Sequence, residues 1–459
     1  MAIATTTQTV DTKQDLGCHA DQAVIKDTIP VVETSFSEDD ASKNGVSSPS
    51  TPPLQKARSV IHHHLEHLDP LLREFNRQIH SNPEVAYKEF FAHDTLASFL
   101  EKQGFVVKKH AYGLETSFEA EIGQGGRLVV FCAEYDALPG IGHACGHNLI
   151  ATSSLAGFLG AVQTLKELNL PGRIRILGTP AEEGGGGKVK LIEAGAFNPP
   201  EDIAAAIMAH PVALHQIGGE ADCFGLAAFK LIASHKFRVE FSGKTAHAAG
   251  EPWKGRNALD AAVAAYSSVA LLRQQIQPDE RMHGIIEVGG TVPNVIPEYT
   301  RMNWYIRSPT NKRCDELLKR VKTCLEAAAA ATDCSINYIA APTYQNLRAN
   351  ETLCQTFVDE MAALDKKVLL HVTKAGLFNA STDMGNVSHL VPSFHGAFVI
   401  PTDPDVAGHN PKFAASAGTD EGHVAAINCA KGMAMLAIRT LLEDKTAAGA
   451  RKDFETDDD

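Results

Sequence analysis

The chain has 459 residues, of which 44% are hydrophobic and 21% are charged, as is usual for a soluble globular protein large enough for two hydrophobic cores. Its formal net charge is −13 and its acidic residues are scattered, so it offers no basic stripe to a phosphate backbone and we expect no nucleic-acid binding. The nine cysteines are irregularly spaced from Cys18 to Cys429, which predicts reduced thiols in a cytoplasmic compartment.

Residues 1–56 are predicted to be a disordered tail because they are rich in Thr, Ser, Asp and Glu and lack sustained periodicity. Asp11, Lys13 and Asp15 interrupt any apolar segment near the N-terminus, so neither a secretory signal nor an organelle transit peptide is expected. The most apolar helical stretch, residues 149–165, contains Thr and Ser and is shorter than the ~20 residues that a bilayer requires. It is predicted to be a buried core helix, and no membrane association is expected.

The first predicted helix covers residues 60–75, where apolar residues recur at helical spacing. Four histidines decorate it: His62, His63, His64 and His67. A histidine cluster can bind metal, but the local spacing fixes no acidic or cysteine partner, so a solvated helix face is the preferred interpretation. A second helix is predicted over residues 95–103, ended by Gly104.

The next segments alternate between strands and helices. The apolar run at 128–133 is typical of a central strand buried on both faces, and it is followed by a helix at 149–168 and strands at 173–178 and 204–208. This alternation predicts a doubly wound α/β domain, in which ligands bind where loops leave the carboxyl ends of the strands. The positions of Asp136, the Cys145 loop, Glu182, Glu183 and His210 agree with one such site.

From residue 237 onward the order of predicted elements changes. A strand (237–241), a helix (257–274), two strands (284–288 and 302–307), a helix (312–331) and a strand (335–339) give the βαββαβ order of a ferredoxin-like domain. We interpret residues 235–341 as a satellite domain inserted between two parts of the first domain, residues 57–234 and 342–445. The second part contains a helix at 351–364, a strand within 393–400 and a closing helix at 422–442. Residues 446–459 are predicted to be an acidic, flexible tail.

Residues 143–148, HACGHN, place Cys145 and His147 two positions apart on a loop, with Gly146 between them. A thiolate and a neutral imidazole at this spacing can bind one metal if both face the same cavity. The alternative is a buried cysteine beside histidines that are satisfied by hydrogen bonds.

Glu182 and Glu183 follow a predicted strand and precede four glycines. Adjacent side chains point in different directions, so one carboxylate can bind a metal while the other faces an attacking water as general base. The alternative is a pair of solvated loop acids. The glycine run lacks the Ser or Thr and the earlier Gly of a P-loop, which argues against nucleotide binding.

Seven motifs make residues 57–445 resemble the zinc-dependent aminoacylase and carboxypeptidase metallopeptidase family, in particular its amidohydrolase branch, which includes hippurate hydrolase and auxin-conjugate hydrolases. The motifs are EYDALP (134–139), HACGH (143–147), PAEEG (180–184), AHP (209–211), GKTAHAA (243–249), GGTVPNVIP (289–297) and GHN (408–410). The resemblance implies a metal-binding α/β catalytic domain interrupted by a ferredoxin-like satellite domain. It also implies an enzyme that hydrolyses the amide bond of a dipeptide or an N-acyl amino acid.

The resemblance carries roles for individual residues. It implies two divalent metal ions, zinc or alternatively manganese, with five ligands: Cys145, His147, Glu183, His210 and His409. It makes Glu182 the general base that takes a proton from the attacking water and passes it to the leaving amine. Asp136 resembles a carboxylate that orients a ligand imidazole, with a turn former as the alternative.

In the satellite domain, His247 resembles the family histidine that reaches the substrate carbonyl as the oxyanion develops, often across a dimer interface. The alternative is an ordinary loop histidine. Asn294 and Arg307 are candidates for substrate binding because an Arg fork suits a free carboxylate, although Arg307 could equally be a surface charge at a strand end. The implied partners are a small-molecule substrate and a second copy of the chain, bound through the satellite domain.

Two features depart from the usual pattern of the amidohydrolase branch. Asn148 replaces the Asp that usually ends the first motif, so we expect a changed charge around the ligands. Residues 381–388, STDMGNVS, look more like β-alanyl-dipeptidase-like members, which favours a dipeptide over an auxin-like conjugate as substrate. The alternative of another class is a non-catalytic metal-binding scaffold, which would normally have lost a ligand or the base, and neither is lost here.

Overall fold

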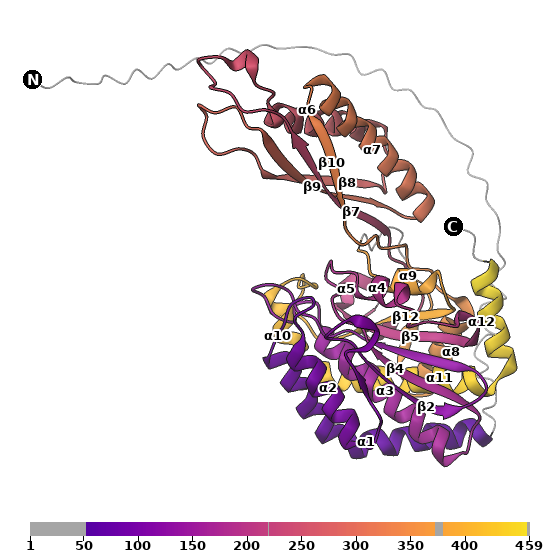
Figure 1. Ribbon diagram of the computed structural model, residues 1–459. Helices are drawn as coiled ribbons and strands as arrows, with labels where there is room; N and C mark the ends of the chain where they lie inside the picture. Colours follow the sequence, from indigo (N-terminus) through magenta and orange to yellow (C-terminus); the bar gives the residue numbers. More distant parts are fainter. Residues whose placement is uncertain (1–51, 219, 372–379, 457–459) are drawn as a thin grey trace, which may run out of the picture. The chain divides into compact units, whose positions relative to one another are not determined.

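The computed structural model describes residues 52–218, 220–371 and 380–456, and Figure 1 shows the arrangement of their helices and strands. Within these residues the first domain is built on an eight-stranded sheet. In spatial order its strands are β1 (Lys108–Lys109), β2 (Phe118–Gln124), β4 (Gly172–Gly178), β3 (Leu128–Ala133), β5 (Ile203–Val212), β12 (Ser393–Val399), β6 (Cys223–Leu226) and β11 (Lys367–Leu369). The central strands β4, β3, β5 and β12 are parallel to one another, whereas β2 and β6 pair with them antiparallel.

Both faces of this sheet are buried because side chains along a strand alternate between two hydrophobic cores. On β3, Val129 and Phe131 belong to one core, while Val130 and Cys132 belong to the other. The helices that pack on the first core are α1 (Pro52–Ser81), α2 (Phe90–Lys102), α3 (His147–Glu167), α8 (Glu351–Ala362), α10 (Pro411–Ala417) and α11 (Asp420–Leu442). The second core is covered by α4 (Gly187–Glu193), α5 (Leu214–Ile217) and α9 (Met384–Ser388). Helices on both faces confirm the predicted doubly wound α/β domain (Figure 1).

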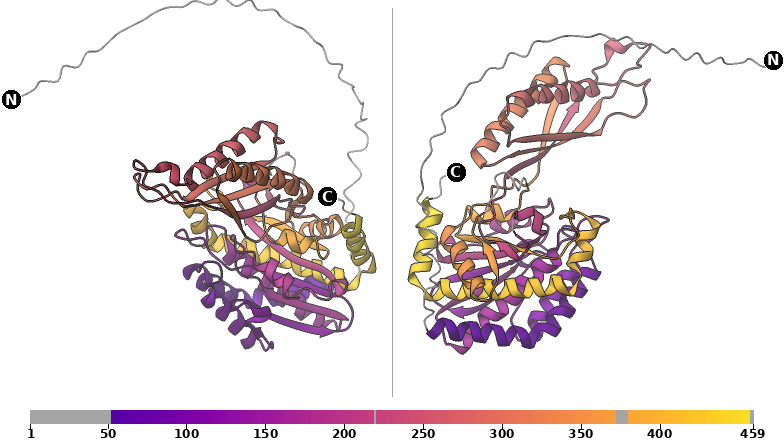
Figure 2. Two further views of the ribbon diagram at one scale, coloured as in Figure 1. Left: turned by 45° about the horizontal axis from the view of Figure 1, so that its top comes forward. Right: turned by 180° about the vertical axis from the view of Figure 1, so that it is seen from behind.

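Helices α1, α3 and α11 lie side by side under the sheet (Figures 1 and 2). Helix α3 is the predicted core helix, and most of its residues are buried. Helix α11 is long and apolar enough to cross a membrane, but 78% of its most apolar window is buried inside the protein. Packing against α3 and the sheet explains its apolar composition without a membrane.

The first half of α1 carries His62, His63, His64 and His67 at exposed or half-exposed positions. None of them belongs to a group of potential metal ligands within the described ranges. Their positions agree with the predicted solvated helix face.

The inserted satellite domain has its own sheet and its own core. In chain order its elements are β7 (Ala233–Ser242), α6 (Ala258–Leu272), β8 (Arg281–Val288), β9 (Tyr299–Ser308), α7 (Asn311–Ala331) and β10 (Ser335–Ala340). The four strands are antiparallel in the order β10-β7-β9-β8, and α6 and α7 pack on one face around the buried Trp304. This order is the predicted ferredoxin-like arrangement.

Two predicted limits are wrong. A disordered tail is predicted over residues 1–56, of which residues 1–51 lie outside the described residues. Residues 52–56 do not belong to a tail, because they are already part of α1. Proline is tolerated in the first turn of a helix because the amide hydrogens there have no helical partner. The prolines at positions 52 and 53 therefore do not delay α1, and Leu54 and Ala57 are buried in the core.

The acidic tail predicted over residues 446–459 is also corrected. Residues 444–456 form a helix, α12 (Asp444–Thr456), and only residues 457–459 lie outside the described range. Thr446 and Ala450 are buried, and the side chain of Asn350 donates a hydrogen bond of 2.7 Å to the carbonyl of Ala450. Packing against α8 overrides the polar composition on which the prediction rested.

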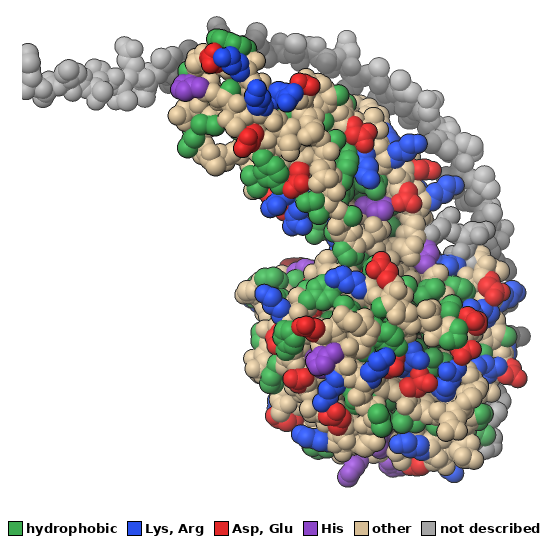
Figure 3. Space-filling model, in the orientation of Figure 1, with side chains coloured by type: hydrophobic (Ala, Val, Ile, Leu, Met, Phe, Trp, Pro, Cys, Tyr) green, Lys and Arg blue, Asp and Glu red, His purple; other side chains and the backbone are tan. Residues whose placement is uncertain are grey.

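On the face shown in Figure 3, acidic and basic side chains are interspersed. This distribution follows the scattered charges of the sequence.

Candidate metal and active site

The loop before α3 places two predicted ligands next to each other. Gly146 precedes α3 in the left-handed conformation, with φ +79°. A Cβ atom there would lie 2.5 Å from Cγ of Pro211, so only glycine fits the turn. The turn leaves Cys145 on the loop and makes His147 the first residue of the helix.

The five predicted metal ligands come from distant segments and meet at the carboxyl ends of the central strands. Sγ of Cys145 lies 3.4 Å from Nε2 of His210, near the end of β5. Nε2 of His409 lies 3.2 Å from a carboxylate oxygen of Glu183, in the loop after β4. The groups whose ligand atoms lie within 4.8 Å of one another are Cys145–His147–His210, Cys145–Glu183–His409 and His147–Glu182–Glu183.

The hydrogen bonds behind these side chains orient them toward a common point. Nδ1 of His147 lies 3.0 Å from a carboxylate oxygen of Asp136, whose other oxygen accepts a hydrogen bond of 2.9 Å from the amide of Glu183. Nδ1 of His210 lies 2.7 Å from the carbonyl of Pro211. Each ring therefore uses one nitrogen for the protein and keeps Nε2 for another group, as metal-binding histidines do. This is the geometry that the interpretation of Asp136 requires.

The donors fit a metal. Nε2 of His147 is buried and has no hydrogen-bond partner among the described residues, and the nearest carboxylate oxygen, from Glu134, is 3.6 Å away. An orphaned buried nitrogen costs free energy unless something binds it. A cysteine sulfur, as thiolate, and imidazoles around it are donors that favour zinc, whereas the carboxylates would also suit manganese.

Two non-glycine residues at the site have left-handed backbones, with φ +61° at Ala181 and φ +65° at His409. Such conformations cost about 1–3 kcal/mol and persist where the surroundings fix them. Here the amide of Ala181 donates to the carboxylate of Glu89, at 2.8 Å, and the amide of His409 donates to the carbonyl of Ala144, at 2.7 Å. These bonds hold in place the loops that carry Glu182 and the last predicted ligand.

The two adjacent glutamates have opposite electrostatic surroundings. Burial and the nearby carboxylates of Glu134 and Glu183 raise the pKa of Glu182 well above its ordinary value. Burial also opposes the ionisation of Glu183, but the hydrogen bond from His409 and the charge of His147 outweigh it and lower its pKa to about 2. Glu183 is therefore suited to be an anionic ligand, and Glu182 to hold and release a proton.

Burial is also the largest influence on the pKa values of two further proposed ligands, Cys145 and His210. It raises the pKa of the Cys145 thiol, with a further contribution from the charge of Glu183. It lowers the pKa of His210 to about 4, assisted by His147. The imidazole of His210 is thus neutral near pH 7, as a metal ligand must be.

These side chains line a cavity of about 840 Å³. Cys145, Glu182, Glu183, His210 and His409 contribute to its wall from the first domain. The satellite domain contributes Arg307, whose guanidinium donates a hydrogen bond of 3.2 Å to the hydroxyl of Ser381. The structure therefore brings the predicted substrate-binding arginine into the same cavity as the predicted ligands.

His247 and Asn294 do not line this cavity. Both are exposed on neighbouring satellite loops, where the amide of Ala248 donates to the carbonyl of Asn294. Nδ1 of His247 accepts hydrogen bonds from the amides of Ala249, at 3.2 Å, and Gly250, at 2.9 Å. The proton of the neutral ring is therefore on Nε2.

Sequence reasoning missed several residues around the site. Lys236 and His395 line the cavity, and neither nitrogen of the buried His395 has a hydrogen-bond partner in the described part of the chain. The buried Lys188 bridges Glu134 and Asp383, at 2.7 Å from the latter. The only sequence signal was a polar residue inside an apolar strand at His395, and a lysine directly after a glycine run at Lys188.

The buried side chain of Asn148 contacts two neighbouring helices. Its side-chain amide donates hydrogen bonds of 2.8 Å to the side chain of Asn76 and to the carbonyl of Ala417. It thus joins α3 to α1 and α10, and the changed charge around the ligands that we expect from Asn in place of Asp stays a prediction. His143 similarly bonds the carbonyl of Ile79, at 3.1 Å, as a supporting residue would.

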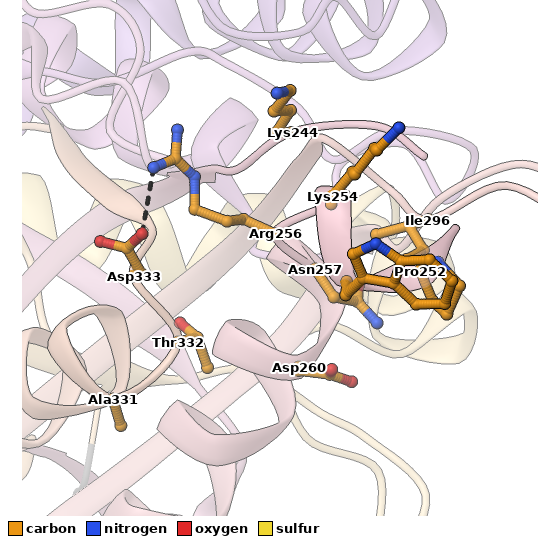
Figure 4. Close-up of a pocket in the computed structure, with 12 residues that line it drawn as sticks. Lys244, Pro252, Lys254, Arg256, Asn257, Asp260, Ile296, Ala331, Thr332 and Asp333 are labelled. Carbon is orange, nitrogen blue, oxygen red and sulfur yellow. Dashed lines mark hydrogen bonds and ion pairs between the residues drawn. The ribbon is translucent and has the colours of Figure 1, made fainter. Parts of the chain in front are cut away.

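A second cavity, of about 820 Å³, lies wholly within the satellite domain (Figure 4). It is bordered by Lys244, Lys254 and Asp260, and its wall includes the ion pair between Arg256 and Asp333, at 3.0 Å. No predicted ligand or catalytic residue lines it. The candidate active site is therefore the cavity at the carboxyl ends of the central strands.

Comparison with known proteins agrees with this fold. Residues 130–429 match the sequence profile of Peptidase family M20/M25/M40. The chain is 38% identical to the Xaa-Arg dipeptidase of Mus musculus over 90% of this chain and 94% of that protein. It is 31% identical to one of the subunits of the p-aminobenzoyl-glutamate hydrolase of Escherichia coli, over 56% of this chain and 55% of that protein.

A crystal structure from Bacillus subtilis, described as a dinuclear metal-binding peptidase of the M20 family, has a similar fold. Its TM-score is 0.56 at 19% identity, with 82% of this chain and 99% of that chain covered. The family and the donor set together indicate divalent metal ions. The chain belongs to Peptidase family M20/M25/M40 and is a metal-dependent enzyme of the dipeptidase and amidohydrolase type.

Proposed function

We propose that this chain binds two divalent ions, zinc or manganese, and hydrolyses the amide bond of a dipeptide or an N-acyl amino acid. One observation carries the proposal. Five donors from four separate segments, together with the adjacent carboxylate of Glu182, converge on the cavity that also contains Arg307. The proposed ligands are Cys145, His147, Glu183, His210 and His409.

Bound metal ions would lower the pKa of a water and polarise the scissile carbonyl. Glu182 is the group that takes the proton from the attacking water and passes it to the leaving amine, and its raised pKa suits both steps. Asp136 fixes the ring of His147 and the backbone of Glu183. Arg307 lines the same cavity, and its proposed role is to hold the carboxylate of the substrate and so orient the amide bond.

We further propose a homodimer in which His247 serves the active site of the partner subunit. With its proton on Nε2, His247 can donate a hydrogen bond to a developing oxyanion. The satellite domain exposes large apolar side chains, including Trp253 (76%), Leu271 (78%) and Ile285 (62%). Ile285 lies on β8, an edge strand of the satellite sheet. Apolar side chains beside a sheet edge are typical of a surface that another chain covers.

Replacing His247 by Ala should lower kcat about 10²- to 10³-fold, the usual cost of one lost oxyanion donor. Mixing this variant with Glu182→Ala tests the action in trans, because mixed dimers would combine one intact base with one intact His247. We expect the mixture to exceed the summed activity of the separate variants. A control mixture of His247→Ala with the double variant Glu182→Ala/His247→Ala contains no intact His247 and should show no gain. If the mixture of the two single variants also shows no gain, the proposal is contradicted.

A substrate panel tests the proposed function. The name of one relative specifies an Xaa-Arg dipeptide as its substrate, and the name of the other specifies aminobenzoyl-glutamate. In both compounds an amide bond joins a C-terminal amino acid to the group before it. We expect metal-replete protein to cleave dipeptides faster than hippurate or indole-acetyl amino acids at equal concentration. Bound metal without hydrolysis of any of these compounds would contradict the function and favour a metal-binding scaffold.

A further inference from the structure

The satellite domain gives the active-site cavity a cationic wall. Side chains along a strand alternate between its two faces. On β7 Phe237 packs in the satellite core, and on β9 Ile306 does the same, so their neighbours Lys236 and Arg307 are on the opposite face. Both of these cations line the cavity, together with Tyr305 of β9.

Lys236 is buried at this wall, with only 8% of the residue exposed. Its Nζ lies 3.4 Å from the ring centroid of Tyr344 and 5.6 Å from that of Tyr305. No carboxylate of the described residues forms an ion pair with it. Burial, the largest influence, lowers the pKa of Lys236. A buried ammonium without a carboxylate partner is costly, so its position points to an anion that enters the cavity.

The acidic groups of the same cavity already have other roles. Of the described residues that line it, the carboxylates are Glu182 and Glu183, which we propose as base and metal ligand. The residues that directly precede Ala380 in the sequence, 372–379, contain no Asp or Glu. The described residues of this wall therefore offer no available carboxylate to a cationic substrate side chain, whereas Lys236 can bind an anionic one.

We propose that this cavity selects substrates whose C-terminal amino acid has a carboxylate side chain, with Arg307 at the α-carboxylate and Lys236 at the side-chain carboxylate. The inference rests on the hydrolase function proposed above and specifies its substrate class. It predicts a preference different from the one in the name of the mouse relative, Xaa-Arg dipeptidase.

Three dipeptides that differ only in the C-terminal side chain test this inference: Ala-Glu, Ala-Leu and Ala-Arg. Wild-type protein should have its highest kcat/KM for Ala-Glu and its lowest for Ala-Arg. Replacing Lys236 by Met should lower kcat/KM for Ala-Glu roughly 10- to 100-fold, mainly through KM, because a charge-assisted hydrogen bond is lost. The value for Ala-Leu should change little, Lys236→Arg should retain the preference, and Lys236→Glu should shift it toward Ala-Arg.

The matched control is Lys322→Met on α7, because Lys322 also lies over a tyrosine of the satellite domain, at 5.1 Å from the ring centroid of Tyr338, but outside the cavity. It should leave all three rates unchanged. A wild-type enzyme that cleaves Ala-Arg at least as fast as Ala-Glu would overturn the inference. So would an equal loss for all three dipeptides in Lys236→Met, which would mean that Lys236 only offsets the charge of Glu182.

Binding of the free amino acids separates this inference from the proposed function. Calorimetry on metal-replete protein should show tighter binding of L-glutamate than of L-leucine or L-arginine, and Lys236→Met should remove the difference. If this order is found but no dipeptide is cleaved, the inference on binding holds and the hydrolase function fails. If dipeptides are cleaved without any difference between the amino acids, the function holds and the inference fails.

Discussion

Replacing Glu182 by Ala or by Gln should lower kcat about 10²- to 10⁴-fold, the usual contribution of a positioned general base, while the metal content stays that of the wild type. Glu182 lines the cavity beside the predicted ligands, and burial with two neighbouring carboxylates raises its pKa. A side chain that accepts and returns a proton during the reaction affects the rate more than the binding of substrate or metal. Steady-state kinetics and elemental analysis of the same sample measure both quantities.

The neighbouring glutamate supplies the matched control. Glu182 and Glu183 both belong to a group of ligand atoms within 4.8 Å of one another, so proximity alone does not separate base from ligand. We expect Glu183→Gln to lose metal and activity together, whereas Glu182→Gln loses activity alone. Loss of metal in the Glu182 variants would make Glu182 a ligand, and normal turnover would exclude it as the base.

Replacing His210 by Ala should remove a metal ligand and abolish most of the activity. Its Nε2 lies 3.4 Å from Sγ of Cys145, and its other nitrogen is held by the carbonyl of Pro211. Loss of a supporting hydrogen bond around a metal costs about 10- to 100-fold in affinity, and loss of a ligand should cost more. Titration of the metal-free variant with zinc should show weaker binding than wild type, and Cys145→Ala should behave in the same way.

His143 is the control for this experiment because it lies in the same hexapeptide but bonds the carbonyl of Ile79 and belongs to no group of potential ligands within the described residues. His143→Gln should keep the wild-type metal affinity, even if it lowers the free energy of unfolding. Weaker metal binding in His143→Gln than in His210→Ala would contradict the proposed ligand set.

The central part of the fold follows closely from the sequence. The strand predicted at 128–133 is observed as Leu128–Ala133, because a strand buried on both faces is a continuous apolar run with clear ends. The ferredoxin-like order is also observed, since each of its elements has its own period of apolar residues. The local sequence pattern fails to predict the C-terminal end: α12 is polar in sequence, and it packs against α11 and against α8 and β5, which are distant from it in sequence.

The candidate site also contains residues whose position could be predicted from the sequence and residues whose position could not. Cys145, His147 and Glu183 stand in dense local motifs at strand ends, so their proximity could be expected. The orientation of Lys236 and Asn148 depends on contacts between distant segments. Lys236 faces the cavity because of the register of β7 in the satellite sheet, and Asn148 faces α1 because α3 packs there. Neither contact has a signature in the surrounding sequence.

The most direct test of the account is to titrate metal-free protein with zinc or manganese and to follow the hydrolysis of a dipeptide on the same sample. The donor set predicts no hydrolysis before metal is added, a rise with each addition, and a plateau at two ions per chain. Hydrolysis by the metal-free protein, or a plateau at a single ion, would contradict the proposed dinuclear site.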